Sequence, residues 1–124
     1  MRMGPCKSKP VILVVEDEVL IRMGATALVE DLGYDYFEAS SADEAIELLE
    51  QHPEITIIFT DIEMTGSMDG LQLAAFVRRR WPPVQFIIVS GNHAAIASEM
   101  PKGAVFFRKP YSNAAIGEAI SALS

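Results

Sequence analysis

The chain has 124 residues, enough for one domain with a buried core, and its ten basic and seventeen acidic residues give a net charge of −7. This charge would repel a nucleic-acid backbone, so we expect no direct binding to DNA or RNA. The single cysteine, Cys6, excludes a disulfide within the chain, and no apolar run reaches the length of a membrane span. These features predict a protein of the cytoplasm without membrane insertion.

The beginning of the chain divides into a tail and the first elements of a domain. Residues 1–10 are polar and contain one glycine and two prolines, so we expect a loose tail before a domain over 11–124. The run from Val11 to Val15 is short, continuous and β-branched, which is typical of a strand buried on both faces. Residues 18–32 then have apolar side chains at helical spacing, and Gly33 marks the end of that helix.

Strand and helix patterns continue to alternate along the chain. We expect residues 34–39 to form a strand at an edge of the sheet, because this segment carries two acidic residues. Ser41 and Glu44 form a capping-box pattern for the next helix, which ends at His52. The remaining elements that we expect are strands over 55–60, 85–90 and 104–108, and helices over 71–81, 94–100 and 114–123.

Five strand–helix units in so short a chain exclude a closed barrel of eight strands. The sheet must therefore be open, and right-handed crossovers place helices on both of its faces. This arrangement is a doubly wound α/β fold, in which ligands bind beyond the carboxyl ends of the strands. The side chains at those ends are thus the candidates for function.

Charged and hydroxyl side chains stand at the ends of four expected strands. Glu16 and Asp17 follow the first strand, Asp61 the third and Lys109 the fifth, while Ser90 ends the fourth. Carboxylates gathered at one edge repel one another, by about 4 kcal/mol for a pair 4 Å apart at an effective dielectric constant near 20. A hard dication would offset this repulsion, and a set of oxygen ligands without His or Cys suits Mg²⁺ better than Zn²⁺.

Beside such a cation, the other side chains have roles in phosphoryl transfer. The Asp61 carboxylate can attack phosphorus and form an acyl phosphate. The Ser90 hydroxyl and the Lys109 ammonium can each bind a phosphoryl oxygen. A cis bond between Lys109 and Pro110, an isomer that is accessible only before proline, would turn the lysine toward the site. The strand ends therefore predict a phosphate-accepting aspartate at a magnesium site.

Five motifs stand in order at the ends of these strands, in the segments 11–18, 61–64, 68–70, 90–91 and 103–110. Together they resemble the receiver domain of two-component response regulators, over residues 11 to about 123. The resemblance implies a flavodoxin-like (βα)5 sandwich of three layers, with a five-stranded parallel sheet in the order 2-1-3-4-5.

The resemblance also implies a phosphoacceptor, a metal site, a phosphoryl-binding pair and a switch pair. The phosphoacceptor is Asp61; the Mg²⁺ ligands are Glu16, Asp17, Asp61 and the backbone carbonyl of Glu63; the phosphoryl-binding pair is Ser90 and Lys109; the switch residues are Ser90 and Phe106. We expect a stand-alone receiver without an output domain, which takes its phosphoryl group from a sensor histidine kinase or a phosphotransfer protein. It would catalyse only its own phosphorylation and dephosphorylation, and would regulate a downstream protein target.

The chain departs from the family pattern at several places. Thr65 stands where the family usually has proline, and the segment 66–68 contains one residue more than usual. Phe106 lacks the hydroxyl of the tyrosine that is often found there. We therefore expect a loop of different shape after Asp61 and a switch that works through packing alone.

Other classes of function stay open. An aspartate-nucleophile phosphatase would need a second aspartate where Glu63 stands, and a flavodoxin-like electron carrier would need a loop rich in glycine and hydroxyls where Glu16 and Asp17 stand. A further alternative is a receiver-like interaction module that is never phosphorylated, which the altered loop after Met64 leaves possible.

Overall fold

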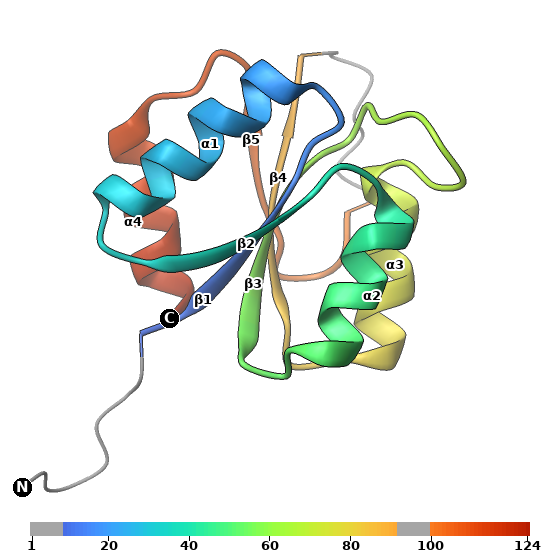
Figure 1. Ribbon diagram of the computed structural model, residues 1–124. Helices are drawn as coiled ribbons and strands as arrows, with labels where there is room; N and C mark the ends of the chain where they lie inside the picture. Colours follow the sequence, from blue (N-terminus) through green and yellow to red (C-terminus); the bar gives the residue numbers. More distant parts are fainter. Residues whose placement is uncertain (1–8, 92–99) are drawn as a thin grey trace, which may run out of the picture.

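The computed structural model describes residues 9–91 and 100–124. Its centre is a parallel sheet in the order β2-β1-β3-β4-β5, which confirms the predicted doubly wound fold (Figure 1). The strands are β1 (Val11–Val15), β2 (Asp35–Ala39), β3 (Ile55–Asp61), β4 (Gln85–Ser90) and β5 (Val105–Arg108). The helices are α1 (Val19–Asp31), α2 (Ala42–Gln51), α3 (Gly70–Arg80) and α4 (Asn113–Leu123).

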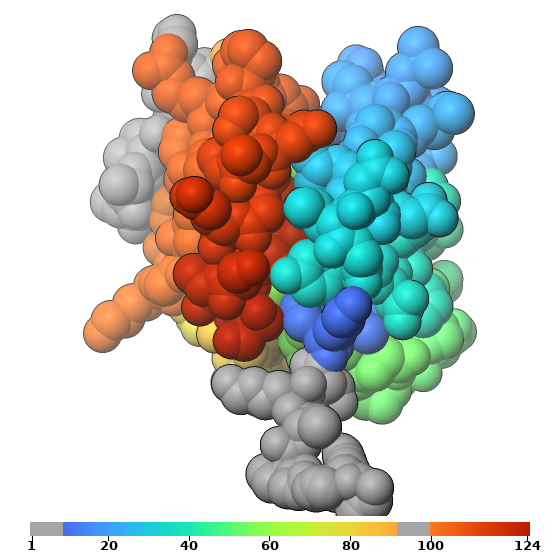
Figure 2. Space-filling model, turned by 90° about the vertical axis from the view of Figure 1, so that its left-hand side faces the viewer, coloured from blue at the N-terminus to red at the C-terminus, as the bar shows by residue number. Residues whose placement is uncertain are grey.

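Helices cover both faces of the sheet, α1 and α4 on one side and α2 and α3 on the other (Figure 1). The continuous apolar strands follow from this arrangement, because successive side chains point to opposite faces and both faces are buried. Ile12 and Val14 belong to the core under α1 and α4, whereas Leu13 and Val15 belong to the core under α2 and α3. Figure 2 looks onto the face that α1 and α4 form, with α4 in red beside the blue and cyan of α1.

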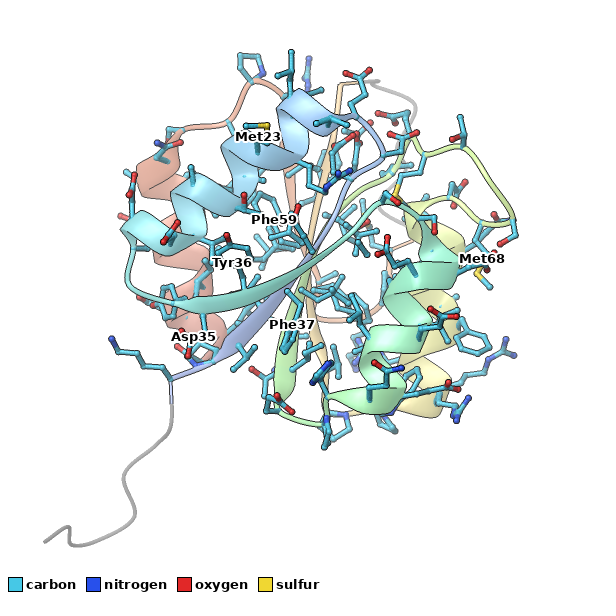
Figure 3. The ribbon with its side chains drawn as sticks, in the orientation of Figure 1. Met23, Asp35, Tyr36, Phe37, Phe59 and Met68 are labelled. Carbon is cyan, nitrogen blue, oxygen red and sulfur yellow. The ribbon has the colours of Figure 1, made fainter. Side chains whose placement is uncertain are left out.

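Strand β2 lies at an edge of the sheet, as its acidic residues predicted. Its consecutive aromatic side chains, Tyr36 and Phe37, pack against opposite cores (Figure 3). Asp35 and Glu38 are exposed. A strand with one neighbour can therefore carry charge at its exposed positions and still bury aromatic surface on both sides.

For the elements that the structure describes, the expected boundaries are correct to within a residue or two, but the helix caps differ. The Ser41 hydroxyl accepts a hydrogen bond from the Glu44 amide, as expected, while the Glu44 carboxylate accepts from the amide and hydroxyl of Ser40. The predicted capping box at α2 is thus only half formed. A complete capping box stands instead at α3, between Asp69 and Gln72.

Two sequence predictions concern segments that the structure does not describe. The tail was expected over residues 1–10, of which 1–8 lie outside the described residues. The helix expected over 94–100 also lies outside them, apart from Met100. In the part of the chain that is described, no helix has both the length and the apolar character needed to cross a bilayer.

Candidate functional site

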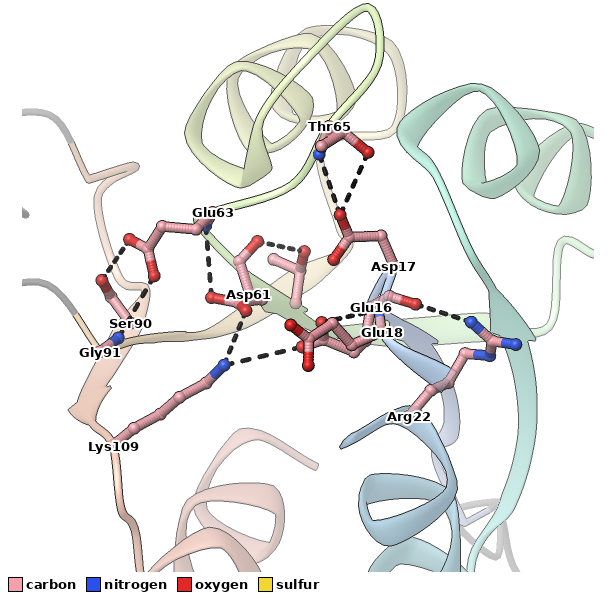
Figure 4. Close-up of polar contacts among 11 residues, drawn as sticks. Glu16, Asp17, Glu18, Arg22, Asp61, Glu63, Thr65, Ser90, Gly91 and Lys109 are labelled. Atoms are coloured by element: carbon pink, nitrogen blue, oxygen red, sulfur yellow. Dashed lines mark hydrogen bonds and ion pairs between the residues drawn. The ribbon is translucent and has the colours of Figure 1, made fainter. Parts of the chain in front are cut away.

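The carboxyl ends of three strands bring Glu16, Asp61 and Lys109 together (Figure 4). Asp61 is the last residue of β3 and only 5% exposed, and Lys109 follows β5. The Lys109 Nζ lies 2.7 Å from Asp61 Oδ2 and 3.7 Å from Glu16 Oε1. The peptide bond between Lys109 and Pro110 is cis, which confirms that prediction. One ammonium group thus stabilises two buried carboxylates.

The pKa values of Glu16 and Lys109 are both raised at this edge of the sheet. Burial raises the pKa of Glu16 from 4.5 to about 7; the charge of Asp61 adds to the shift, and the Glu18 amide and Lys109 oppose it. Burial would lower the pKa of Lys109, but its hydrogen bond with Asp61 and the charges of Asp61, Glu16 and Glu63 raise it overall. A proton on Glu16 and the charge of Lys109 therefore both relieve the crowding that we expected a metal alone to offset.

Asp17 is held by the loop over 62–69, which we call the β3–α3 loop. The backbone amide and the hydroxyl of Thr65 both donate to Asp17 Oδ2, at 3.1 and 3.2 Å (Figure 4). The hydrogen bond from the Thr65 amide is the main cause that lowers the pKa of Asp17. Proline has no N–H and no hydroxyl, so the usual family residue at this position could make neither bond. Thr65, which the sequence marked as a departure, thus lowers the pKa of Asp17 and favours its ionised form.

Ser90, at the end of β4, already makes a hydrogen bond with the side chain of Glu63. Its side chain is fully buried, and its hydroxyl donates to Glu63 Oε2 at 2.5 Å. The Gly91 amide donates to the other carboxylate oxygen, Glu63 Oε1, at 3.2 Å (Figure 4). The Glu63 amide in turn donates to Asp61 Oδ1 at 3.3 Å. The sequence assigned only the backbone carbonyl of Glu63 a role, which stays a prediction, and missed its carboxylate.

Gly70, the first residue of α3, fixes the return of the β3–α3 loop. Its amide donates to the Ile62 carbonyl at 2.9 Å, and a Cβ at this position would lie 2.1 Å from the Asp61 carbonyl oxygen. Only glycine allows two backbones to approach so closely. The sequence placed Gly70 in a motif without giving it a structural role.

The predicted magnesium ligands share one edge of the sheet without forming a closed cage. Within residues 9–91 and 100–124, no group of three or more Asp, Glu, His or Cys side chains is placed to hold a metal ion. The donor chemistry nevertheless fits a hard cation, since Asp17 and Asp61 supply carboxylate oxygens and Thr65 favours the ionised form of Asp17. Mg²⁺ commonly uses one or two carboxylates and retains several waters, so it needs no cage of protein ligands.

Phe106 lies on β5 and is partly buried against the core under α2 and α3. This contact agrees with a side chain that works through packing. Its inward movement, like the phosphoryl-binding roles of Ser90 and Lys109, stays a prediction.

Comparison with known proteins gives the fold a family. The model of the response regulator receiver domain matches residues 12–121. The sensor kinase CckA of Brucella abortus is 38% identical over 105 residues, which cover 82% of this chain and 11% of that protein. The nitrogen assimilation regulatory protein NtrX of Azorhizobium caulinodans is 35% identical over 106 residues, or 82% of this chain and 23% of that protein. The chain thus spans less than a quarter of the length of either relative.

A solved structure agrees with these matches. The response regulator receiver protein from Sinorhizobium medicae superimposes with a TM-score of 0.84 at 29% sequence identity, covering 92% of this chain and 93% of that one. The superposition therefore includes nearly the whole of both chains. The chain therefore belongs to the response regulator receiver domain family.

Proposed function

We propose that Asp61 accepts a phosphoryl group and that the phosphorylated chain regulates a partner protein. The observation that carries this proposal is the pairing of the buried Asp61 carboxylate with Lys109 at 2.7 Å, beside Glu16. A carboxylate held at the mouth of a strand-end site can attack phosphorus, and the nearby ammonium can stabilise the charge of the group transferred.

The reaction forms a P–O bond at the Asp61 carboxylate while the bond from phosphorus to the donor breaks. With a phosphohistidine donor, the electron pair of the P–N bond remains on the imidazole nitrogen, and no atom of the receiver leaves. Mg²⁺, held by Asp17 and Asp61 with Glu16, would neutralise charge on the phosphoryl oxygens when bound. The carbonyl of Glu63 completes the proposed ligand set.

The donor in this proposal is a sensor histidine kinase or a phosphotransfer protein, and the site acts in the cytoplasm. The relatives agree with such a setting, since one is a sensor kinase and another a regulatory protein. The protein would catalyse no reaction other than its own phosphorylation and dephosphorylation. Its downstream target is a protein, because the net charge of −7 opposes contact with nucleic acid.

A small phosphodonor tests the proposal directly. Incubation with Mg²⁺ and acetyl phosphate should add one phosphoryl group to the intact mass of the wild-type protein, and Asp61→Asn should add none. A chelator should prevent the gain. An unmodified wild type, under conditions that phosphorylate another receiver, would contradict the proposal.

One observation favours a second candidate, a receiver-like interaction module that is never phosphorylated. The Glu63 carboxylate already accepts hydrogen bonds from Ser90 and Gly91, which an incoming phosphoryl group would otherwise use. In that case the unmodified surface alone would bind partners, and the mass experiment would show no change in any variant of the chain.

A further inference from the structure

The contacts of Glu63 extend from the end of β3 to the end of β4. Its carboxylate accepts from the Ser90 hydroxyl at 2.5 Å and from the Gly91 amide at 3.2 Å, and its own amide donates to Asp61 Oδ1. Figure 4 shows the side chain turned from the Asp61 strand toward Ser90 and Gly91. We call the two carboxylate contacts the Glu63 latch.

The latch and a phosphoryl group compete for the same donor. A serine hydroxyl has a single proton, so Ser90 cannot donate to the Glu63 carboxylate and to a phosphoryl oxygen at the same time. Because Ser90 is fully buried, solvent cannot replace whichever bond is lost. The Glu63 carboxylate and a phosphoryl group are both negatively charged, so they would also repel each other if both approached Ser90.

We propose that Glu63 is an internal competitor of the phosphoryl group, which holds Ser90 and Gly91 in the unphosphorylated protein and leaves them when Asp61 is phosphorylated. This inference rests on the proposed function of Asp61. Phosphorylation forms one P–O bond at Asp61 and breaks one bond in the donor; at Glu63 no covalent bond changes, and only the hydrogen bonds from Ser90 and Gly91 are exchanged.

Release of the Glu63 carboxylate would be a second conformational change on phosphorylation, beside the predicted movement of Phe106. Glu63 and Ser90 are 27 residues apart, and their contact joins the β3–α3 loop to the end of β4. Release of the carboxylate would free the loop on one side and the Gly91 amide on the other. Glu63 is then a positioning residue: it acts on the reaction through Ser90, and it favours the unphosphorylated state.

Glu63→Gln tests the latch with almost no change in shape. The substitution removes the negative charge that repels the phosphoryl group, so we expect phosphorylation by acetyl phosphate to become about tenfold faster. The matched control is Glu47→Gln, which removes the same charge from an exposed position on α2 and should leave the rate unchanged.

The amide resonance of Gly91 provides a readout that does not depend on the rate. In the wild-type protein it should shift when Asp61 is phosphorylated, because its carboxylate acceptor leaves. In unphosphorylated Glu63→Ala it should already lie away from its wild-type position. The wild-type measurement needs no variant and so does not depend on how well a variant folds.

The outcomes separate the latch from the phosphoacceptor. Faster phosphorylation of Glu63→Gln than of the wild type, together with the Gly91 shift, would support the latch. If wild type and Glu63→Gln are phosphorylated at equal rates and the Gly91 resonance does not move, the latch is wrong while the role of Asp61 stands. If neither protein is phosphorylated, both proposals fail.

Discussion

The carboxyl ends of the strands and the β3–α3 loop lie side by side, but different interactions hold them. At the strand ends, Asp61, Glu16 and Lys109 are placed by the sheet, and their charges balance one another over 2.7 and 3.7 Å. The loop is held by hydrogen bonds from its own side chains, including that from Thr65 to Asp17 and that from Ser67 to Asp43 at 2.8 Å.

This difference suggests a division of labour between the two regions. In the proposed function, the strand ends supply the phosphoacceptor Asp61 and the charged groups beside it, Glu16 and Lys109. The loop supplies contacts made by its own residues, such as Glu63 and Thr65, the latter standing where the family usually has proline. Changes at the strand ends should strongly slow or abolish phosphorylation, whereas changes in the loop should adjust stability and rate. The predictions below test that division, from the largest expected effect to the smallest.

Removal of the Lys109 ammonium should have the largest effect. Lys109→Ala leaves Asp61 and Glu16 without their shared cation and removes a group that can stabilise the transferred phosphoryl group, so phosphorylation by acetyl phosphate should slow about 100-fold. The rate of mass gain measures this. Lys102→Ala removes the same charge from an exposed position and should react like the wild type; equal slowing in both variants would contradict a specific role for Lys109.

Addition of a methyl group at Gly70 should destabilise the fold. The new Cβ would lie 2.1 Å from the Asp61 carbonyl oxygen, so the loop or the end of β3 must move. We expect Gly70→Ala to lower the free energy of unfolding by about 3 kcal/mol in a urea titration. Gly24→Ala is the matched control, because its Cβ would meet no atom within 4 Å on helix α1 and should stabilise the protein slightly.

Glu16 should make stability fall as pH rises in metal-free buffer. Between its ordinary pKa of 4.5 and the folded value of about 7, the unfolded chain loses the Glu16 proton while the folded protein retains it. The contribution of Glu16 is therefore complete below pH 4.5 and lost as pH rises through 7. Glu16→Gln keeps a neutral group, so its stability relative to wild type should rise by about 3 kcal/mol between pH 4 and pH 8. A constant difference across this range would show that Glu16 titrates normally.

Loss of the Thr65 hydroxyl should have the smallest effect. Thr65→Val retains the amide hydrogen bond to Asp17 and loses the one from Oγ1, so we expect a decrease of about 1 kcal/mol in the free energy of unfolding at pH 7. Thr65→Pro removes both donors and should lose more, with a rise in the pKa of Asp17 that NMR titration can follow. Thr56→Val, at an exposed position of β3, should cause no loss. A Thr65→Val protein as stable as wild type would exclude this contact as a stabilising one.

The same division separates what the sequence could predict from what it could not. An apolar run followed by an acid or a lysine predicts a strand and its terminal group, so Glu16, Asp61 and Lys109 could be placed at one edge. The contact of Glu63 with Ser90 and that of Thr65 with Asp17 join residues 27 and 48 positions apart. Such pairs depend on the path of the loop backbone. The sequence of a loop has no helical or strand periodicity from which that path could be predicted.

Some missed features did have a local signal. Asp69 and Gln72 have the spacing of a capping box that was not predicted, whereas the box predicted from Ser41 and Glu44 at the start of α2 is only half formed. The carboxylates alone predict that a metal ion must offset their mutual repulsion. Lys109 and the raised pKa of Glu16 supply part of this compensation before any metal binds.

The most direct test of the central claim identifies the modified residue. Borohydride reduces an acyl phosphate to an alcohol, so treatment of the phosphorylated protein should convert Asp61 to homoserine, which peptide mass spectrometry locates. We predict homoserine at position 61 alone, and none without Mg²⁺ and acetyl phosphate. Homoserine at another aspartate, such as Asp17, or a phosphorylated protein without any reducible acyl phosphate, would contradict the assignment of Asp61 as the phosphoacceptor.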